Sequence, residues 1–201
     1  GDQSNLRSMS ERLKKDKNDI NLAIATPAAQ TLQKIDKDTP MVFTAITDPK
    51  SAGLLTNTKK PDLNATGVTD MVDVKGQIDF LHQMFPKAKK IGLFFNAAEP
   101  NSVVQIKLAK AEIKKLGLTA VQKTAATTND VEQAVTALAH QVDAIYIPTD
   151  NNAAAAMPTI GKVSTKVKVP VVTADATMIK LAGVATHGIS YKELGKQTAK
   201  M

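Results

Sequence analysis

Two kinds of segment alternate along the 201-residue chain. Short runs rich in β-branched residues predict strands, and between them apolar positions recur at helical spacing. The predicted strands are Ile20–Ala25, Met41–Ile46, Ile91–Phe95, Leu118–Gln122, Ala144–Ile147, Val169–Thr173 and Val184–Ile189. Most of these runs are apolar on both faces, as in parallel sheets that are covered by helices on each side. The alternation therefore predicts an α/β fold.

Three amphipathic segments predict the helices that cover these sheets. They are "VKGQIDFLHQMF", "VVQIKLAKAEIKKLG", which ends at a capping Gly117, and "DVEQAVTALAHQ". Their predicted apolar faces are Ile78, Leu81 and Phe85 in the first, Val104, Leu108 and Ala111 in the second, and Val131, Val135 and Leu138 in the third. We expect the aromatic residues Phe94, Phe95 and Tyr146 to lie in the sheet core.

A polar stretch without periodicity, Thr56–Thr66, separates the first βα units from the rest. The short run "TGVTD" follows it, and we interpret this run as a crossover between two lobes. The predicted partition is 1–67 plus 184–201 for a first lobe and 68–183 for a second. Because two parallel strands cannot stand alone, we expect Val184–Ile189 to complete the first sheet and the first lobe to be incomplete.

Composition and spacing exclude several kinds of chemistry. The net charge is +7, but lysine supplies almost all of it because Arg7 and Arg12 are the only arginines. Lysines scattered along helices indicate solvated faces, so we expect no nucleic-acid partner. Cysteine is absent. The three histidines are too far apart in the sequence for metal-ligand spacing; they are His82, His140 and His187. No G-x-G-x-x-G, P-loop or G-x-S-x-G motif occurs. We therefore expect no metal, no cofactor and no enzymatic activity.

Five predicted strands end in polar side chains where a helix begins. These candidate ligand-binding residues are Thr26, Thr47, Asp48, Asn96, Glu99, Asn101, Ser102, Asp150, Asn151 and Asp175. In open α/β sheets the carboxyl ends of the strands face a crevice in which ligands bind. Helix N-termini suit a carboxylate, and the acidic side chains suit an ammonium group. The pattern predicts a pocket for a small zwitterion, although the same residue types also cap helices, as we expect Thr26 to do.

The chain resembles the ABC-transporter substrate-binding proteins of the tryptophan/tyrosine-type family. The matching segments are "AIATPAAQ", "PMVFTAITDPKSAGL", "NATGVTD", "KKIGLFFNAAEPNS", "VDAIYIPTDNN" and "YKELGKQTAKM". The resemblance implies a type I periplasmic-binding-protein fold, with two Rossmann-like lobes joined by hinge crossings, and it places the ligand-facing turns on the ten candidate residues. Family members begin with a β–α–β unit ahead of "GDQSNL" and continue past "LGKQTAKM", which again implies an incomplete first lobe.

The function implied by the resemblance is amino-acid import. Such a protein binds an amino acid, aromatic or branched, in the cleft between its lobes and delivers it to a membrane permease. We expect a monomer outside the cytoplasm, either periplasmic or anchored as a lipoprotein, with hinges at "TGVTD" and around Val184–Tyr191. Two alternatives stay open: the effector-binding domain of a lactose-repressor-type transcriptional regulator, which has the same fold, and an α/β enzyme.

Overall fold

A computed structural model describes residues 3–201 of the chain. It divides into two compact units, the first made of Gly1–Met71 and Ser190–Met201 and the second of Val72–Ile189. The chain thus passes from one unit to the other after Met71 and returns after Ile189. Both crossings lie a few residues beyond the predicted boundaries, 67/68 and 183/184.

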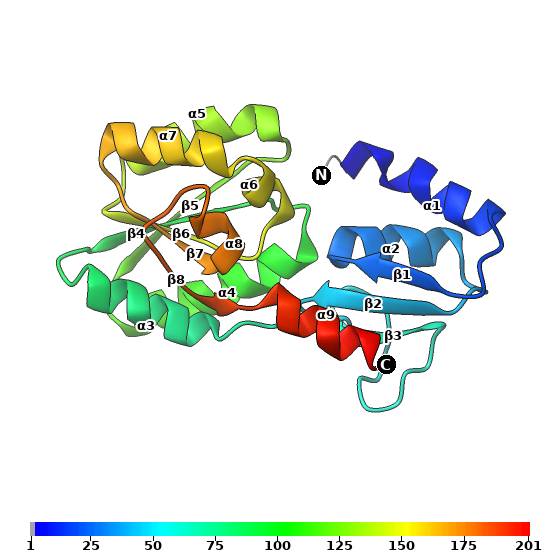
Figure 1. Ribbon diagram of the computed structural model, residues 1–201. Coiled ribbons are helices and arrows are strands. Elements are labelled where there is room, and N and C mark those ends of the chain that lie inside the picture. The colour runs from blue at the N-terminus through cyan, green and yellow to red at the C-terminus, as the bar shows by residue number, and fades with distance from the viewer. Residues whose placement is uncertain (1–2) are drawn as a thin grey trace. The chain divides into compact units, whose positions relative to one another are not determined.

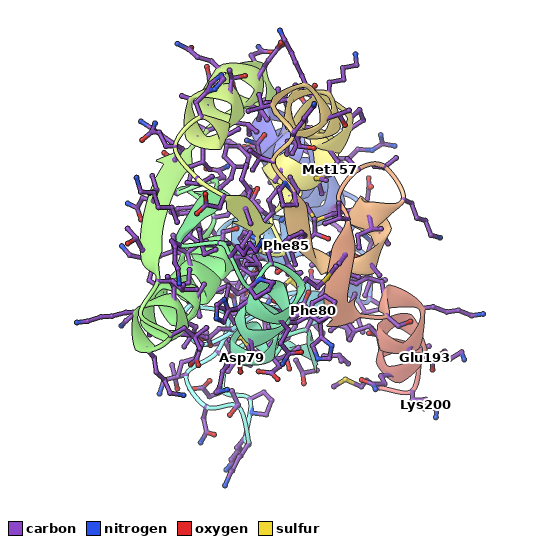
Figure 2. The ribbon with its side chains drawn as sticks, turned by 90° about the vertical axis from the view of Figure 1, so that its left-hand side faces the viewer. Asp79, Phe80, Phe85, Met157, Glu193 and Lys200 are labelled. Atoms are coloured by element: carbon purple, nitrogen blue, oxygen red, sulfur yellow. The ribbon has the colours of Figure 1, made fainter. Side chains whose placement is uncertain are left out.

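The first unit contains a three-stranded parallel sheet of order β1-β2-β3. Helix α1 packs beside α2, and α9 lies along β2 and β3 (Figure 1). The side chains of Glu193 and Lys200 project outward from α9 (Figure 2). The elements are η1 (Gln3–Asn5), α1 (Leu6–Lys15), β1 (Asn21–Ile24), α2 (Thr26–Ile35), β2 (Met41–Ile46), β3 (Ala65–Thr69) and α9 (Tyr191–Ala199).

The second unit contains a five-stranded parallel sheet of order β5-β4-β6-β7-β8. Helices α5 and α7 cover one face and α3 and α4 the other (Figure 1). The elements are α3 (Val74–Met84), β4 (Lys90–Phe95), α4 (Pro100–Lys115), β5 (Thr119–Thr124), η2 (Thr128–Asp130), α5 (Val131–Ala139), β6 (Ala144–Ile147), α6 (Asn151–Ala155), α7 (Met157–Val167), β7 (Val171–Asp175), α8 (Ala176–Ile179) and β8 (Ala185–Ile189).

The two apolar layers of this sheet form because its central strands β4, β6 and β7 are buried on both faces, as the sequence predicts. Ile145 and Ile147 contribute to the layer under α5 and α7, whereas Ala144 and Tyr146 contribute to the layer under α3 and α4. Phe94, Phe95 and Tyr146 all lie in the core, as predicted. Gly117 has a φ of 73° just past α4, which confirms the predicted glycine cap.

The final predicted strand belongs to the second sheet, so the prediction that it completes the first sheet is wrong. β8 pairs in parallel with β7, with Val172 opposite Ala185. The backbone N–H of Val184 donates to the carbonyl of Val171 at 2.9 Å, and the Thr186 hydroxyl donates to the carbonyl of Thr173. The first sheet gains its third strand from β3, which contains most of the run interpreted as a crossover.

The prediction of the buried face of α4 is also wrong. The predictions for α3 and α5 are confirmed, because five of their six predicted residues are buried. Leu108 is 46% exposed, and the apolar residues that α4 buries are Ile106, Ala109 and Ile113. The buried side of this helix also carries polar residues, among them Ser102 and Gln105. Apolar spacing alone therefore points to the wrong side. In α3 and α5, Phe85 is the exception because it is only half-buried at the helix end.

Candidate ligand-binding turns

The turns that follow β4 and β6 lie next to each other because these strands are neighbours in the sheet. Their polar residues form one hydrogen-bonded group, which we call the β4–β6 polar cluster. It consists of Asn96, Glu99, Asn101, Ser102, Asp150 and Asn151. Its members are all buried except Asn151, which is half-buried. The structure thus brings together six of the ten candidate residues.

Asp150 ties the two turns together through both of its carboxylate oxygens. Oδ2 accepts from the backbone N–H of Asn96 at 2.7 Å and from the Ser102 hydroxyl at 2.6 Å. Oδ1 accepts from the backbone N–H of Ala153 at 2.8 Å, which makes Asp150 the N-cap of α6. Asp150 is therefore a cap that also fixes the start of α4.

Glu99 does the same from the opposite turn. Its Oε2 accepts from the backbone N–H of Asn151 at 3.0 Å and from the side-chain amide of Asn151 at 2.7 Å. Its Oε1 accepts from the backbone N–H of Asn152 at 3.2 Å. The residue is 0% exposed. Such a side chain shapes the site by orienting Asn151.

The buried cluster contains two carboxyl groups, and its surroundings shift the pKa of Asp150. Burial raises the pKa of Asp150 above its ordinary value, and the nearby Glu99 charge raises it further. The hydrogen bonds from Asn96, Ser102 and Ala153 act in the opposite direction without cancelling the effect. The cluster therefore contains an acidic group, Asp150, whose pKa is raised above its ordinary value.

Asn101 leaves one acceptor unused. Its Nδ2 donates to the backbone carbonyl of Thr149 at 2.8 Å and to Glu99 Oε2 at 3.3 Å. Its Oδ1 is buried and has no hydrogen-bond partner among the described residues. A buried polar atom without a partner is unusual and calls for an explanation, such as a bound group.

Sequence reasoning missed one further member of this region, Gln105. Gln105 is fully buried, its Oε1 accepts from the backbone N–H of Thr149 at 3.1 Å, and its Nε2 donates to the Thr149 hydroxyl. Gln105 lies one helical turn after Asn101, on the same side of α4. That spacing was a usable signal, but the apolar pattern of "VVQIKLAK" directed attention to the other side of the helix.

Asp175 lies at the end of β7 and serves α8. Its Oδ1 accepts from the backbone N–H of Thr177 at 2.8 Å, and its Oδ2 accepts from the Thr177 hydroxyl at 2.6 Å. It makes no hydrogen bond to the β4–β6 polar cluster within the described residues. The observed geometry is that of a helix cap.

In the first unit, Thr26 and its neighbour lie in an unusual turn. Ala25, not Thr26, occupies the N-cap position of α2, so the prediction of Thr26 as the cap is wrong by one residue. Ala25 has φ 74° and ψ 152°, a backbone conformation that residues other than glycine rarely adopt. Ala45, near the end of β2, has φ 56°. Strained backbone of this kind is concentrated at functional sites.

Thr47 and Asp48 follow β2, and both are held by hydrogen bonds. The Thr47 hydroxyl donates to Asp70 Oδ1 at 3.1 Å, and Asp70 is a buried residue that sequence reasoning missed. Asp48 accepts from the backbone N–H of Lys50 and from the hydroxyl of Ser51. Burial raises the pKa of Asp48, but these hydrogen bonds outweigh burial and hold the pKa below its ordinary value. Asp48 is thus a half-buried anion.

The chemistry of these turns is that of binding. They offer carboxylate and amide acceptors and the N-terminus of α4, and residues 3–201 contain no group of three or more acidic or histidine side chains arranged to hold a metal. No described helix has the length and apolar character needed to cross a membrane. The carboxylate and amide groups of the turns fit the recognition of a small polar molecule.

Comparison with known proteins decides the family. A family model described as "ABC transporter substrate binding protein" matches residues 1–201. The chain belongs to this family. Its fold is that of type I periplasmic-binding proteins, with helix-flanked parallel sheets, and substrate-binding proteins of ABC transporters work outside the cytoplasm.

Several individual proteins are similar to this chain over its whole length. A tyrosine-binding protein of Clostridioides difficile is 33% identical over 200 residues, which is 100% of this chain and 58% of that protein. An ABC domain from Streptococcus pneumoniae, solved in complex with L-Trp, is 37% identical with a TM-score of 0.97, and the match covers 68% of it. A conserved domain protein from Vibrio cholerae is 32% identical with a TM-score of 0.96, again over 68% of its length. The chain therefore spans only part of each relative.

Proposed function

We propose that this chain belongs to the binding component of an ABC importer whose ligand is an aromatic amino acid, tryptophan or tyrosine. The observation that carries the proposal is the β4–β6 polar cluster, with its buried and unused acceptor on Asn101. Such a site suits a ligand that carries an ammonium group. The choice of an aromatic amino acid is supported by the relatives, one a tyrosine-binding protein and one solved with L-Trp.

The candidate residues divide into two roles within this proposal. Asn101 and Asn151 contact the ligand, with Asn101 Oδ1 accepting from its ammonium group. Glu99, Asp150 and Ser102 hold those two asparagines and their turns in place. Buried hydrogen bonds to charged groups are strong and fix geometry in this way.

The remaining candidates supply further contacts to the same ligand. Thr26, Thr47 and Asp48 from the first unit, together with Asn96 and Asp175 from the second, line the cleft in which the amino acid binds. Asp48 is an anion in a half-buried turn, and an ammonium or indole N–H group is a suitable partner for it.

The side chain of the ligand meets few aromatic residues of this chain. Five phenylalanines and two tyrosines are present and tryptophan is absent. Phe94, Phe95 and Tyr146 are all committed to the sheet core. We infer that aliphatic groups contact the indole or phenol ring.

The importer context completes the proposal. The protein acts without chemical conversion, as a monomer, and passes its ligand to a membrane permease; a lipid anchor or a periplasmic location suits this role. The regulator alternative is less supported, because the family model of the substrate-binding proteins covers the whole chain. Any turnover of tryptophan or tyrosine by the pure protein, detected by mass spectrometry, would contradict the proposal.

Isothermal titration calorimetry of the full-length protein with tryptophan, tyrosine, phenylalanine and leucine tests the ligand. We expect Asn101→Ala and Asn151→Ala each to lose about 1–3 kcal/mol of binding free energy, which is roughly a 5- to 150-fold loss of affinity. Asn152→Ala is the matched control, because its side chain donates to the carbonyl of Ala125 and to no member of the cluster in the described residues. Wild-type affinity in both test variants would remove the cluster from the site.

A further inference from the structure

A second concave site lies at the opposite end of the second unit's sheet. A groove of about 1390 Å³ is lined by residues 84–88, 158, 161–162, 164–166, 168–170 and 181–184 together with Asp143. Asp143, Pro170 and Val184 directly precede β6, β7 and β8, so the groove lies at the amino ends of these strands. The β4–β6 polar cluster follows the carboxyl ends of the strands. This groove, which we call the basic groove, is therefore separate from the proposed amino-acid site.

The basic groove presents aliphatic side chains to solvent. Met84 is 42% exposed, Leu181 60% and Val184 55%. Phe85, at the end of α3, adds a half-buried ring (Figure 2). Exposed aliphatic residues scattered singly are common, but a group of them in one concavity indicates a binding surface.

The backbone that carries these residues is firmly held. The N–H groups of Leu181 and Ala182 both donate to the carbonyl of Met178, and that of Val184 donates to Val171. Gly161 of α7 approaches this loop so closely that a β-carbon there would lie 2.5 Å from the Ala182 side chain. The exposure of Leu181 and Val184 is thus a fixed feature of the groove.

The rim of the groove is positively charged and unneutralised. Lys87, Lys162, Lys166 and Lys168 line it, and none of them forms an ion pair within the described chain. The acidic residue of the lining, Asp143, accepts from the backbone N–H groups of Lys89 and Lys90 at 2.8 Å each. These hydrogen bonds lower the pKa of Asp143, so its charge is already committed to the backbone.

We propose that the basic groove docks an acidic amphipathic segment of a partner protein. The apolar side chains of that segment contact Met84, Leu181 and Val184, and its carboxylates pair with the lysines of the rim. The volume of the groove exceeds the roughly 300–1,000 Å³ of small-molecule pockets. The concave form of the groove suits a helix better than it suits the flat surface of a bilayer. Opposite charges around an apolar centre give such a contact its orientation and its partner selectivity.

A designed probe tests the proposal on the full-length protein. The probe is a fluorescent peptide of Leu, Glu and Ala with leucines on one helical face, and the comparison peptide has the same composition in scrambled order. We expect the probe to bind the wild type and to bind Lys162→Glu/Lys166→Glu about tenfold more weakly or worse. Leu181→Asn should weaken binding without any change of charge.

Matched controls separate docking from general attraction. Lys107→Glu/Lys114→Glu changes the net charge equally on the exposed side of α4, and we expect the probe to bind it as it binds the wild type. Equal binding of the scrambled peptide, or equal loss in this control, overturns the proposal. Tryptophan affinity should be unchanged in all these variants, so failure here is distinct from failure of the amino-acid site.

Two other occupants are outcomes of the same experiment. If vesicles of phosphatidylglycerol and phosphatidylcholine bind the wild type but not Lys162→Glu/Lys166→Glu, while the probe peptide fails, the groove is a membrane contact and the proposal is wrong. If sedimentation shows a dimer that this variant disrupts, the occupant is a second copy of the chain and the proposal is equally wrong.

Discussion

Asp150 links the stability of the second unit to pH. Its pKa is raised in the folded state by burial and by Glu99, relative to an ordinary value of 3.8. As the pH rises above about 4, the unfolded chain releases this proton before the folded chain does. The contribution of Asp150 to the free energy of unfolding is therefore largest below that value and is lost as the pH rises through the raised pKa.

Asp150→Asn tests this linkage because asparagine does not titrate. We expect the wild type to have a higher free energy of unfolding than the variant. The difference between the two free energies should be widest near pH 4 and should narrow toward neutral pH. Urea unfolding at a series of pH values measures it. Asp48 and Asp143 have lowered pKa values, so their contributions to the free energy of unfolding change with pH in a separate pH range, below the ordinary pKa of aspartate. A margin that is constant with pH would contradict the prediction.

At the scale of single elements, β3 depends on one glycine. Gly67 lies against β2, where a β-carbon would come within 2.0 Å of the backbone oxygen of Phe43. Because a backbone atom cannot move aside cheaply, we expect Gly67→Ala to lower the free energy of unfolding by about 1–3 kcal/mol. Chemical denaturation followed by circular dichroism measures the loss.

Gly195 of α9 provides the opposite control. It is a helical glycine, and apart from its chain neighbours and the backbone of its own helix, no described atom lies within 4 Å of an added β-carbon. Alanine there removes the entropic cost of glycine in a helix, so we expect Gly195→Ala to stabilise the protein by about 0.5–1 kcal/mol. If both variants shift stability in the same direction, the close approach of β3 to β2 is not what Gly67 provides.

Gly67 is also one reason why the sequence did not identify β3 as the third strand of the first sheet. The run "ATGVT" contains one large apolar residue, so it lacks the pattern that identifies the other strands. Strands with strong β-branched runs, such as Ile91–Phe95, were predicted within one or two residues of their observed bounds. What fixes β3 is pairing with Met41–Ile46, a contact between segments that no local pattern reveals.

The candidate site shows the same division between local and long-range information. The sequence could place polar turns at strand ends, because strand direction in a parallel sheet follows from the βα alternation. It could not show that Glu99 reaches Asn151 and Asn152, or that Gln105 reaches Thr149. Those contacts depend on β4 and β6 being neighbours, although β5 lies between them in the sequence.

For the whole molecule, the chain crosses between its two units at two places, after Met71 and after Ile189. We expect these crossings to act as hinges. A ligand that contacts residues of both units, such as Thr47 in the first and Asn101 in the second, binds a closed state better than an open one. It therefore shifts the population toward closure.

Small-angle X-ray scattering of the full-length protein measures this shift. We expect saturating tryptophan or tyrosine to reduce the radius of gyration while the circular dichroism spectrum stays unchanged. Asn101→Ala should require more ligand for the same change, because it weakens binding without altering the crossings. A scattering curve that is unaffected by a ligand whose binding calorimetry confirms would place the whole amino-acid site within one unit, and Thr26, Thr47 and Asp48 would then be structural residues of the first.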